Sequence, residues 1–219
     1  MLFAGLIACE TIPPAIQSGP DAEVTFDGLV RVDNSRMDVA WVRPGIDLSS
    51  YNQIMLVGAG IKYRSVREVN RLALSRASEF PLDAEQRERI EASVREVFNE
   101  ELAKIDTFQV VQQAGPNTLA LTGALIDVVS FVPPERAGRV DYYLSTLGAA
   151  TLVLELSDSQ SNQILARAVD GRAIDVVFVT EASRVSNTFE FEREMDAWAD
   201  DIRAGIQTLH DTPLVTAQD

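Results

Sequence analysis

Few residues of this chain belong to the types that catalytic or metal sites use. Cys9 is the only cysteine and His210 the only histidine, and they lie near opposite ends of the chain. A zinc site or a catalytic triad would therefore lack most of its members. The sequence contains neither a phosphate-binding loop nor a Gly-x-Ser-x-Gly elbow. We predict no cofactor and no metal, which leaves the abundant carboxylates as the groups for acid–base chemistry.

Cys9 has a recognisable chemical context. Leu6-Ile7-Ala8 precede it, and this pattern is typical of the bacterial lipobox, in which the cysteine thiol receives a diacylglycerol. Only eight residues precede Cys9 and none is Lys or Arg, whereas a secretory signal has a basic start and about 15–30 residues. We interpret residues 1–9 as a truncated lipoprotein signal and Cys9 as the lipidation site. A chance match at an apolar N-terminus is the alternative.

The residues behind Cys9 are consistent with export. Residues 10–22 contain three prolines and a glycine without periodicity, which predicts an extended tether. A triacylated cysteine would anchor the chain to a membrane without a spanning helix. Because Glu10 rather than Asp follows the cysteine, the expected location is the bacterial outer membrane, with the domain lipid-anchored and facing the periplasm.

The length and charge of the chain favour one acidic domain. The 219 residues are 46% hydrophobic and carry a net charge of −14, enough for a sizeable core without disulfides. Such acidity argues against nucleic acid as a partner. We expect a single α+β domain over residues 23–211 and a C-terminal tail over 212–219.

One basic segment interrupts this acidity. It contains Lys62, Arg64, Arg67, Arg71 and Arg76, with Glu68 as the only acidic residue between them. On a membrane-tethered domain such a segment could contact lipid phosphates or an acidic partner. We therefore name Lys62, Arg64, Arg67 and Arg71 as contact candidates. The alternative is a solvated surface whose arginines pair with the protein's own carboxylates.

Hydrophobic periodicity predicts alternating strands and helices. Asp83 and Gln86 form a capping-box pair at the start of one helix. A second helix carries an apolar stripe that begins at Phe191 and ends at Leu209. The expected strands cover residues 24–32, 37–42, 51–61, 108–111, 118–132, 149–156 and 163–179, and the expected first helix covers 83–105.

This order of elements predicts an α+β fold with a single two-layer sandwich. A twisted, mostly antiparallel sheet would pack against two amphipathic helices on one face. The connection from strand 51–61 through the first helix to strand 108–111 could be a parallel crossover.

Several segments together carry a family resemblance. They are Asp27-Gly28-Leu29-Val30, the stretch from Ala40 to Tyr51 with its Arg-Pro-Gly-x-Asp-Leu-x-x-Tyr pattern, Leu156-Ser157-Asp158 and Ile164-Leu165-Ala166-Arg167. In these segments the chain resembles the proteobacterial lipoproteins grouped as domain of unknown function 3313. The resemblance implies a periplasm-facing lipoprotein and brings no catalytic residues. The Arg43-Pro44-Gly45 segment also has a purely structural interpretation, as a turn that leads into a strand.

The connection between residues 131 and 147 is the remaining candidate for binding. Its Arg136, Arg139, Tyr142 and Tyr143 are of types enriched at binding hot spots, although a hairpin extension packed on the sheet would also explain them. We predict an envelope lipoprotein of unknown biochemical activity, a non-enzymatic binding or assembly module for an envelope protein, a lipid or a glycan. A carboxylate-dependent hydrolase acting on envelope material is the alternative.

Overall fold

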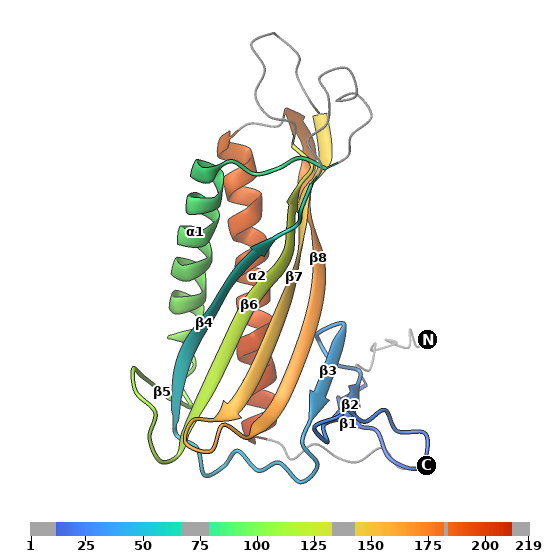
Figure 1. Ribbon diagram of the computed structural model, residues 1–219, viewed down its shortest axis with the longest axis vertical. Coiled ribbons are helices and arrows are strands. Elements are labelled where there is room, and N and C mark those ends of the chain that lie inside the picture. Colours follow the sequence, from blue (N-terminus) through green and yellow to red (C-terminus); the bar gives the residue numbers. More distant parts are fainter. Residues whose placement is uncertain (1–11, 67–78, 133–142, 182–183, 212–219) are drawn as a thin grey trace, which may run out of the picture.

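The strands of the protein form one sheet in the order β1-β2-β3-β8-β7-β6-β4-β5. The computed structural model describes residues 12–66, 79–132, 143–181 and 184–211. The strands are β1 (Ala15–Ile16), β2 (Val30–Asp33), β3 (Val39–Val42), β4 (Gln53–Tyr63), β5 (Gln109–Val111), β6 (Thr118–Ser130), β7 (Tyr143–Asp158) and β8 (Ile164–Glu181). The helices α1 (Ala84–Leu102) and α2 (Arg184–Asp211) lie side by side over one face of this sheet (Figure 1).

Most of the strand pairs are antiparallel, as predicted. β4 is the exception because it runs parallel to both of its neighbours, β5 and β6. The chain therefore passes from β4 through α1 to β5 as a parallel crossover and then places β6 on the other side of β4. The predicted α+β class, with one twisted sheet and two helices on one face, is confirmed.

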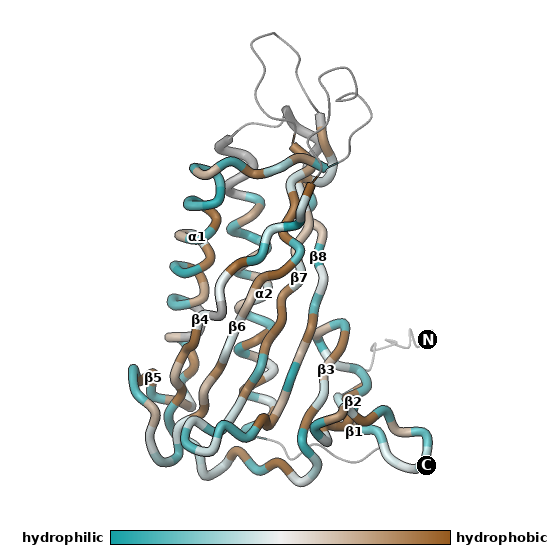
Figure 2. Tube along the Cα trace, viewed as in Figure 1, coloured by the Kyte–Doolittle hydropathy of each residue, from teal (hydrophilic) through white to brown (hydrophobic). Residues whose placement is uncertain are grey.

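The capping residues fix the start of α1. The Asp83 carboxylate accepts the Gln86 backbone N–H at 2.8 Å, and the Asp83 backbone N–H donates to Gln86 Oε1 at 2.8 Å. This reciprocal pair is the predicted capping box. Hydrophobic and hydrophilic residues alternate along α1 (Figure 2), with Val97 buried and Glu96 exposed.

The apolar stripe of α2 packs on the sheet as predicted. Phe191, Met195, Trp198, Ile202 and Ile206 are all buried. The opposing strands contribute inward-facing leucines at alternate positions, including Leu152, Leu154 and Leu156 of β7. None of the helices in the described part of the chain is long and apolar enough to span a bilayer.

The N-terminal edge differs from the expected strands. The run 24–32 is broken, because a turn at Thr25–Gly28 leaves Val24 with an isolated bridge to Val30 and β2 begins only at Val30. Within residues 10–22, which we expected to form a tether, Ala15–Ile16 form β1 and Ile16 is buried. The ordered sheet thus begins before residue 23.

A buried carboxylate connects this edge to the helical layer. Asp170 of β8 is 5% exposed and accepts hydrogen bonds from Trp198 Nε1 at 2.6 Å, from Arg172 Nε at 2.7 Å and from the Asp38 backbone N–H at 2.9 Å. Arg172 in turn donates to Asp201 of α2 at 2.6 Å. A charge removed from water requires such partners, so we call Asp170, Arg172, Trp198 and Asp201 the β8–α2 network.

We expect Trp198→Ala to destabilise the protein by about 3–5 kcal/mol, because the ring is fully buried and its loss leaves a cavity beside an under-satisfied carboxylate. Trp198→Phe keeps most of the ring volume and loses the hydrogen bond to Asp170, so a smaller loss of about 1–3 kcal/mol is expected. Urea unfolding would measure both free energies. Trp41→Phe, at a partly exposed position, is the control, and a loss below about 1 kcal/mol for Trp198→Ala would contradict the docking of α2 on the sheet.

Candidate functional site

Most of the predicted site residues lie outside the part of the chain that the structure describes. These are Cys9, Arg67, Arg71, Arg136, Arg139 and Tyr142. For Tyr143, the structure describes the backbone, which begins β7 opposite Glu181. Lys62 and Arg64 are described, Lys62 as an exposed residue near the end of β4.

Arg64 is engaged by the protein's own carboxylates. Its guanidinium lies 2.7 Å from Glu79 Oε1 and 3.1 Å from Asp127 Oδ2. Hydrogen bonds to Asp127 and Glu79 raise the pKa of Arg64. This agrees with the alternative that we gave for the basic segment, at least at this position, because two neighbouring acids already neutralise the guanidinium.

The two predicted binding segments are attached to the same end of the sheet. β4 ends at Tyr63 opposite Val128 of β6, and Phe80 forms a bridge with Ser130 where the chain returns. β6 ends at this same Ser130, and the chain re-enters the sheet at Tyr143. β4 and β6 therefore end, and β7 begins, at the same end of the sheet (Figure 1).

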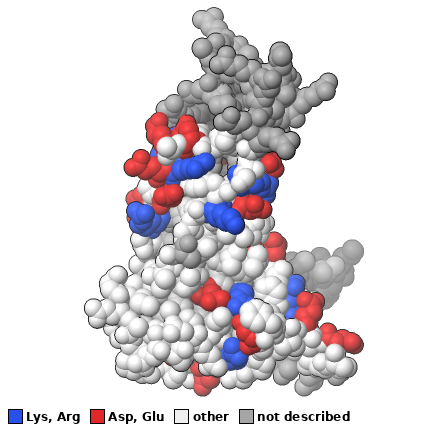
Figure 3. Space-filling view, viewed as in Figure 1, with Lys and Arg blue, Asp and Glu red and all other residues white. Residues whose placement is uncertain are grey.

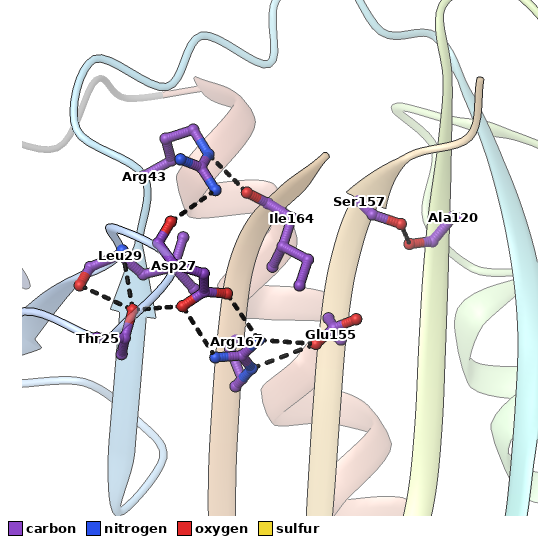
Figure 4. A network of polar contacts seen from close by, with 9 residues as sticks. All are labelled: Thr25, Asp27, Leu29, Arg43, Ala120, Glu155, Ser157, Ile164 and Arg167. Atoms are coloured by element: carbon purple, nitrogen blue, oxygen red, sulfur yellow. Dashed lines mark hydrogen bonds and ion pairs between the residues drawn. The ribbon is translucent and has the colours of Figure 1, made fainter. Parts of the chain in front are cut away.

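Three of the segments that carry the family resemblance, residues 27–30, 40–51 and 164–167, meet in one polar cluster (Figure 4). Arg167 of β8 donates to Asp27 Oδ2 at 2.9 Å and to Glu155 of β7 at 3.0 Å. Arg43 donates to the Ile164 carbonyl at 2.7 Å and to the Asp27 carbonyl at 3.3 Å. We call Thr25, Asp27, Arg43, Glu155 and Arg167 the N-terminal clamp, because it ties residues 25–29 to the centre of the sheet.

The clamp also fixes a tight turn. The Thr25 hydroxyl donates to Asp27 Oδ1 at 2.6 Å and accepts the Leu29 backbone N–H at 2.9 Å. Gly28 has φ +82°, a left-handed conformation that glycine adopts without strain. These contacts support the structural interpretation of Arg43, whose side chain holds the turn rather than pointing to a ligand.

Phe26 lies at the tip of this turn and is 98% exposed. A side chain of this size in water, on a turn held by so many hydrogen bonds, is a preorganised contact point. Val24 is 59% exposed and Ile12 is 71% exposed, so the three most exposed large hydrophobic residues of the described chain belong to residues 12–26. The alternating run 24–32 predicts a strand at Phe26 and therefore gives no hint of this exposed position. The Asp27-Gly28 pair behind it was the available signal of a turn.

Charged side chains gather over α1 and around the β2–β3 edge, and the surface between them is mostly uncharged (Figure 3). Among the described residues, no group of three His, Cys, Asp or Glu side chains is arranged to hold a metal ion. The buried carboxylate of Asp170 accepts three hydrogen bonds from the protein itself. Its burial therefore has a structural explanation.

We expect the clamp to weaken in acid. The Thr25 hydroxyl, followed by Arg167, lowers the pKa of Asp27. Because the folded pKa is the lower one, the contribution to stability is complete above the unfolded value of about 3.9 and is lost as the pH falls through the folded value. Urea unfolding of wild type and Asp27→Asn between about pH 2 and 7 should therefore give free energies that differ at neutral pH and converge in acid. Asp21→Asn, an exposed carboxylate nearby, should show no such convergence. A constant difference between wild type and Asp27→Asn would contradict this role.

Solved structures offer a weak likeness in fold. The protein PelC from Paraburkholderia phytofirmans, solved as a dodecamer, is 11% identical, with a TM-score of 0.34, and the match covers 75% of this chain and 95% of the PelC chain. A putative neuraminyllactose-binding hemagglutinin homolog from Helicobacter pylori is 11% identical, with a TM-score of 0.40 and coverage of 74% and 88%. Protein XCC0632 from Xanthomonas campestris is 10% identical, with a TM-score of 0.37 and coverage of 80% and 92%. No curated protein matches the chain significantly.

A family model identifies the family of this chain from its sequence. The profile of the family described as "Protein of unknown function (DUF3313)" matches residues 24–202, a range that includes the N-terminal clamp, the β8–α2 network and most of both helices. This confirms the resemblance seen in the sequence. The chain belongs to the DUF3313 family.

Proposed function

We propose that this protein is a lipoprotein of the bacterial outer membrane, acylated at Cys9, whose periplasm-facing domain is a non-enzymatic binding module. The observation that carries the proposal is the set of exposed apolar side chains directly behind the lipobox: Ile12, Val24 and Phe26. Large apolar side chains exposed along one edge of a sheet are consistent with membrane or partner contact. The carboxylate-dependent hydrolase has less support, since the buried Asp170 is occupied by three donors.

The distance from Cys9 to the sheet supports membrane contact at the N-terminal edge. Six residues lead from Cys9 to Ala15 of β1, and a chain of that length spans at most roughly 20 Å. An acylated Cys9 would therefore hold the β1 edge close to the lipid surface. Val24 and Phe26 extend from this same edge, because Val24 bridges Val30 at the start of β2.

Lys62, the first residue of the basic segment, lies on β4, toward the opposite edge of the sheet. Five strands separate β1 from β4, which carries Lys62, and six strand spacings amount to roughly 29 Å. We propose that Lys62, Arg67 and Arg71, together with Arg136, Arg139, Tyr142 and Tyr143, form the end that meets an envelope partner. Arg64 is already paired with Glu79 and Asp127 and is left out of this proposed contact. The membrane contact itself is then assigned to the N-terminal edge.

The lipid attachment is tested by metabolic labelling. The gene, expressed in a bacterium with the DNA upstream of Met1, should incorporate labelled palmitate into the wild-type protein, because the Cys9 thiol is the acceptor of the acyl chains. Cys9→Ala should incorporate none. Equal labelling of the two proteins would end the lipoprotein interpretation.

The membrane contact is tested on vesicles with the unacylated full chain, Cys9→Ser. We expect Val24→Ser/Phe26→Ser to reduce its partitioning by on the order of tenfold, because the two apolar side chains lose their transfer free energy. Val110→Ser/Ile126→Ser is the matched control, since both side chains are exposed on β5 and β6 and should leave partitioning unchanged.

Salt separates the two candidate surfaces in the same assay. Apolar transfer is not screened by ions, whereas contacts between basic residues and anionic lipid weaken beyond a Debye length of about 8–10 Å. Retention that persists in high salt and depends on Phe26 supports the N-terminal edge. Retention lost in high salt and unaffected by Phe26→Ser would instead assign the contact to Lys62 and its neighbours.

A further inference from the structure

A cavity separates α1 from the sheet. The space between α1 and strands β4, β6 and β7 has a volume of about 570 Å³. Small-molecule sites in proteins measure about 300–1,000 Å³ and are lined mainly by apolar side chains. The apolar residues lining this cavity include Leu56, Val94, Phe98, Leu121, Leu125 and Leu154.

Two glycines, which have no Cβ atom, leave this space open. Gly58 of β4 and Gly123 of β6 are paired in the parallel register, and both line the cavity. A Cβ atom at Gly58 would meet no atom within 4 Å, and one at Gly123 would only touch Leu154 at 3.5 Å. Glycine inside a strand weakens the strand, and it occurs where another group must approach the backbone closely. The glycines therefore keep open a volume that ordinary core residues would fill.

The cavity is open along the edge of β4. β5 pairs only with Gln53–Met55 of β4, so the part of β4 that lines the cavity, from Leu56 to Ile61, has no strand on its outer side among the described residues. Val57, Gly58 and Gly60 are exposed there. A ligand could therefore enter between β4 and α1 without separating paired strands.

The polar residues at this opening all come from α1. Glu91, Arg95 and Asn99 follow one another at intervals of four residues, are exposed, and line the cavity. The Tyr63 hydroxyl donates to Glu91 Oε1 at 3.4 Å, and burial, with the charge of Glu91, raises the pKa of Tyr63 to about 12, so the phenol keeps its proton. Arg95 makes no ion pair with any residue that the structure describes. One guanidinium thus remains available at the opening of an apolar cavity.

We propose that this cavity binds a single-chain anionic amphiphile, with its acyl chain against the leucines and its head group on Arg95. Beyond the helix rim, no lining residue has a charged or amide side chain, so few groups there could replace the many hydrogen bonds that a buried sugar or nucleotide loses to water. An alkyl chain suits such a lining, and a guanidinium matches a carboxylate or a phosphate in geometry. The proposal names a ligand for the binding function proposed above and does not depend on acylation of Cys9.

Calorimetric titration of the full chain carrying Cys9→Ser tests the site with defined probes. Dodecanoate, below its micelle concentration, should bind, and 1-dodecanol, which has the same chain without the charge, should bind at least tenfold more weakly. Dodecyl phosphate, as a second anionic probe, identifies the preferred head group. Tighter binding of dodecyl phosphate would point to a lysophospholipid, tighter binding of dodecanoate would point to a free fatty acid, and either result supports the site. Absence of binding by both anionic probes would overturn the proposal, and the labelling of Cys9 would be unaffected by that result.

Two variants assign the binding to this cavity. Gly58→Leu places a side chain into the open volume, so it should reduce dodecanoate binding at least tenfold while the urea midpoint stays at or above that of wild type. Arg95→Gln, on the exposed rim, should weaken dodecanoate about tenfold and leave dodecanol unchanged. Gly205→Ala is the control, because Gly205 lies in α2, away from this cavity, and has space for a Cβ. Undiminished dodecanoate binding by Gly58→Leu would overturn the assignment to this cavity. If Arg95→Gln weakened dodecanoate and dodecanol equally, the proposed contact between Arg95 and the anionic head group would be wrong.

Discussion

The fold depends on the carboxylate of Asp170. It is a charged group in the interior of the sandwich, 5% exposed, and without partners its removal from water would cost several kcal/mol. Its three donors come from three places: Trp198 on α2, Arg172 on β8 itself and the Asp38 backbone just before β3. The hydrogen bonds to this one buried carboxylate therefore fix both the position of α2 on the sheet and the attachment of β3 to β8. The β1–β3 edge, which pairs with the rest of the sheet only through β3, depends on the same contact.

The hydrogen bonds of Asp170 reach α2 and not α1, so the two helices are held on the sheet by different contacts. α2 is bonded to the sheet by the β8–α2 network and by a stripe of fully buried side chains. α1 has its capping box and its contact with α2, but the glycines of β4 and β6 leave space beneath it. Regions with fewer buried apolar contacts open at a lower free energy. The α2 half can therefore act as the rigid frame, while the α1 half can admit a ligand without disturbing that frame.

The sequence predicts the parts of this structure that depend on local periodicity. The capping pair Asp83 and Gln86 places the start of α1, and the stripe from Phe191 locates the buried side of α2. Tertiary pairing determines the rest. Asp170 is one of 33 acidic residues, and only its register opposite Leu152 shows that it points into the core. Gly58 and Gly123 are 65 residues apart in the sequence, so the cavity that they form becomes visible only once β4 and β6 are paired. The alternation of apolar and polar residues over 24–32 predicts a strand at Phe26, whereas the Asp27-Gly28 turn exposes it.

The charge of the protein constrains how a lipid anchor could orient the domain. A net charge of −14 repels an anionic membrane surface, and this repulsion acts over roughly 8–10 Å at physiological salt. An anchor at Cys9 would nevertheless bring the β1 edge within about 20 Å of the lipid. Apolar contacts at Ile12, Val24 and Phe26 would offset the repulsion at that edge, and the clamp between Asp27 and Arg167 would hold Phe26 in place without leaving either charge unpaired. The opposite edge, with β4 and the opening beside α1, would then face away from the anchoring contact and stay accessible to ligands.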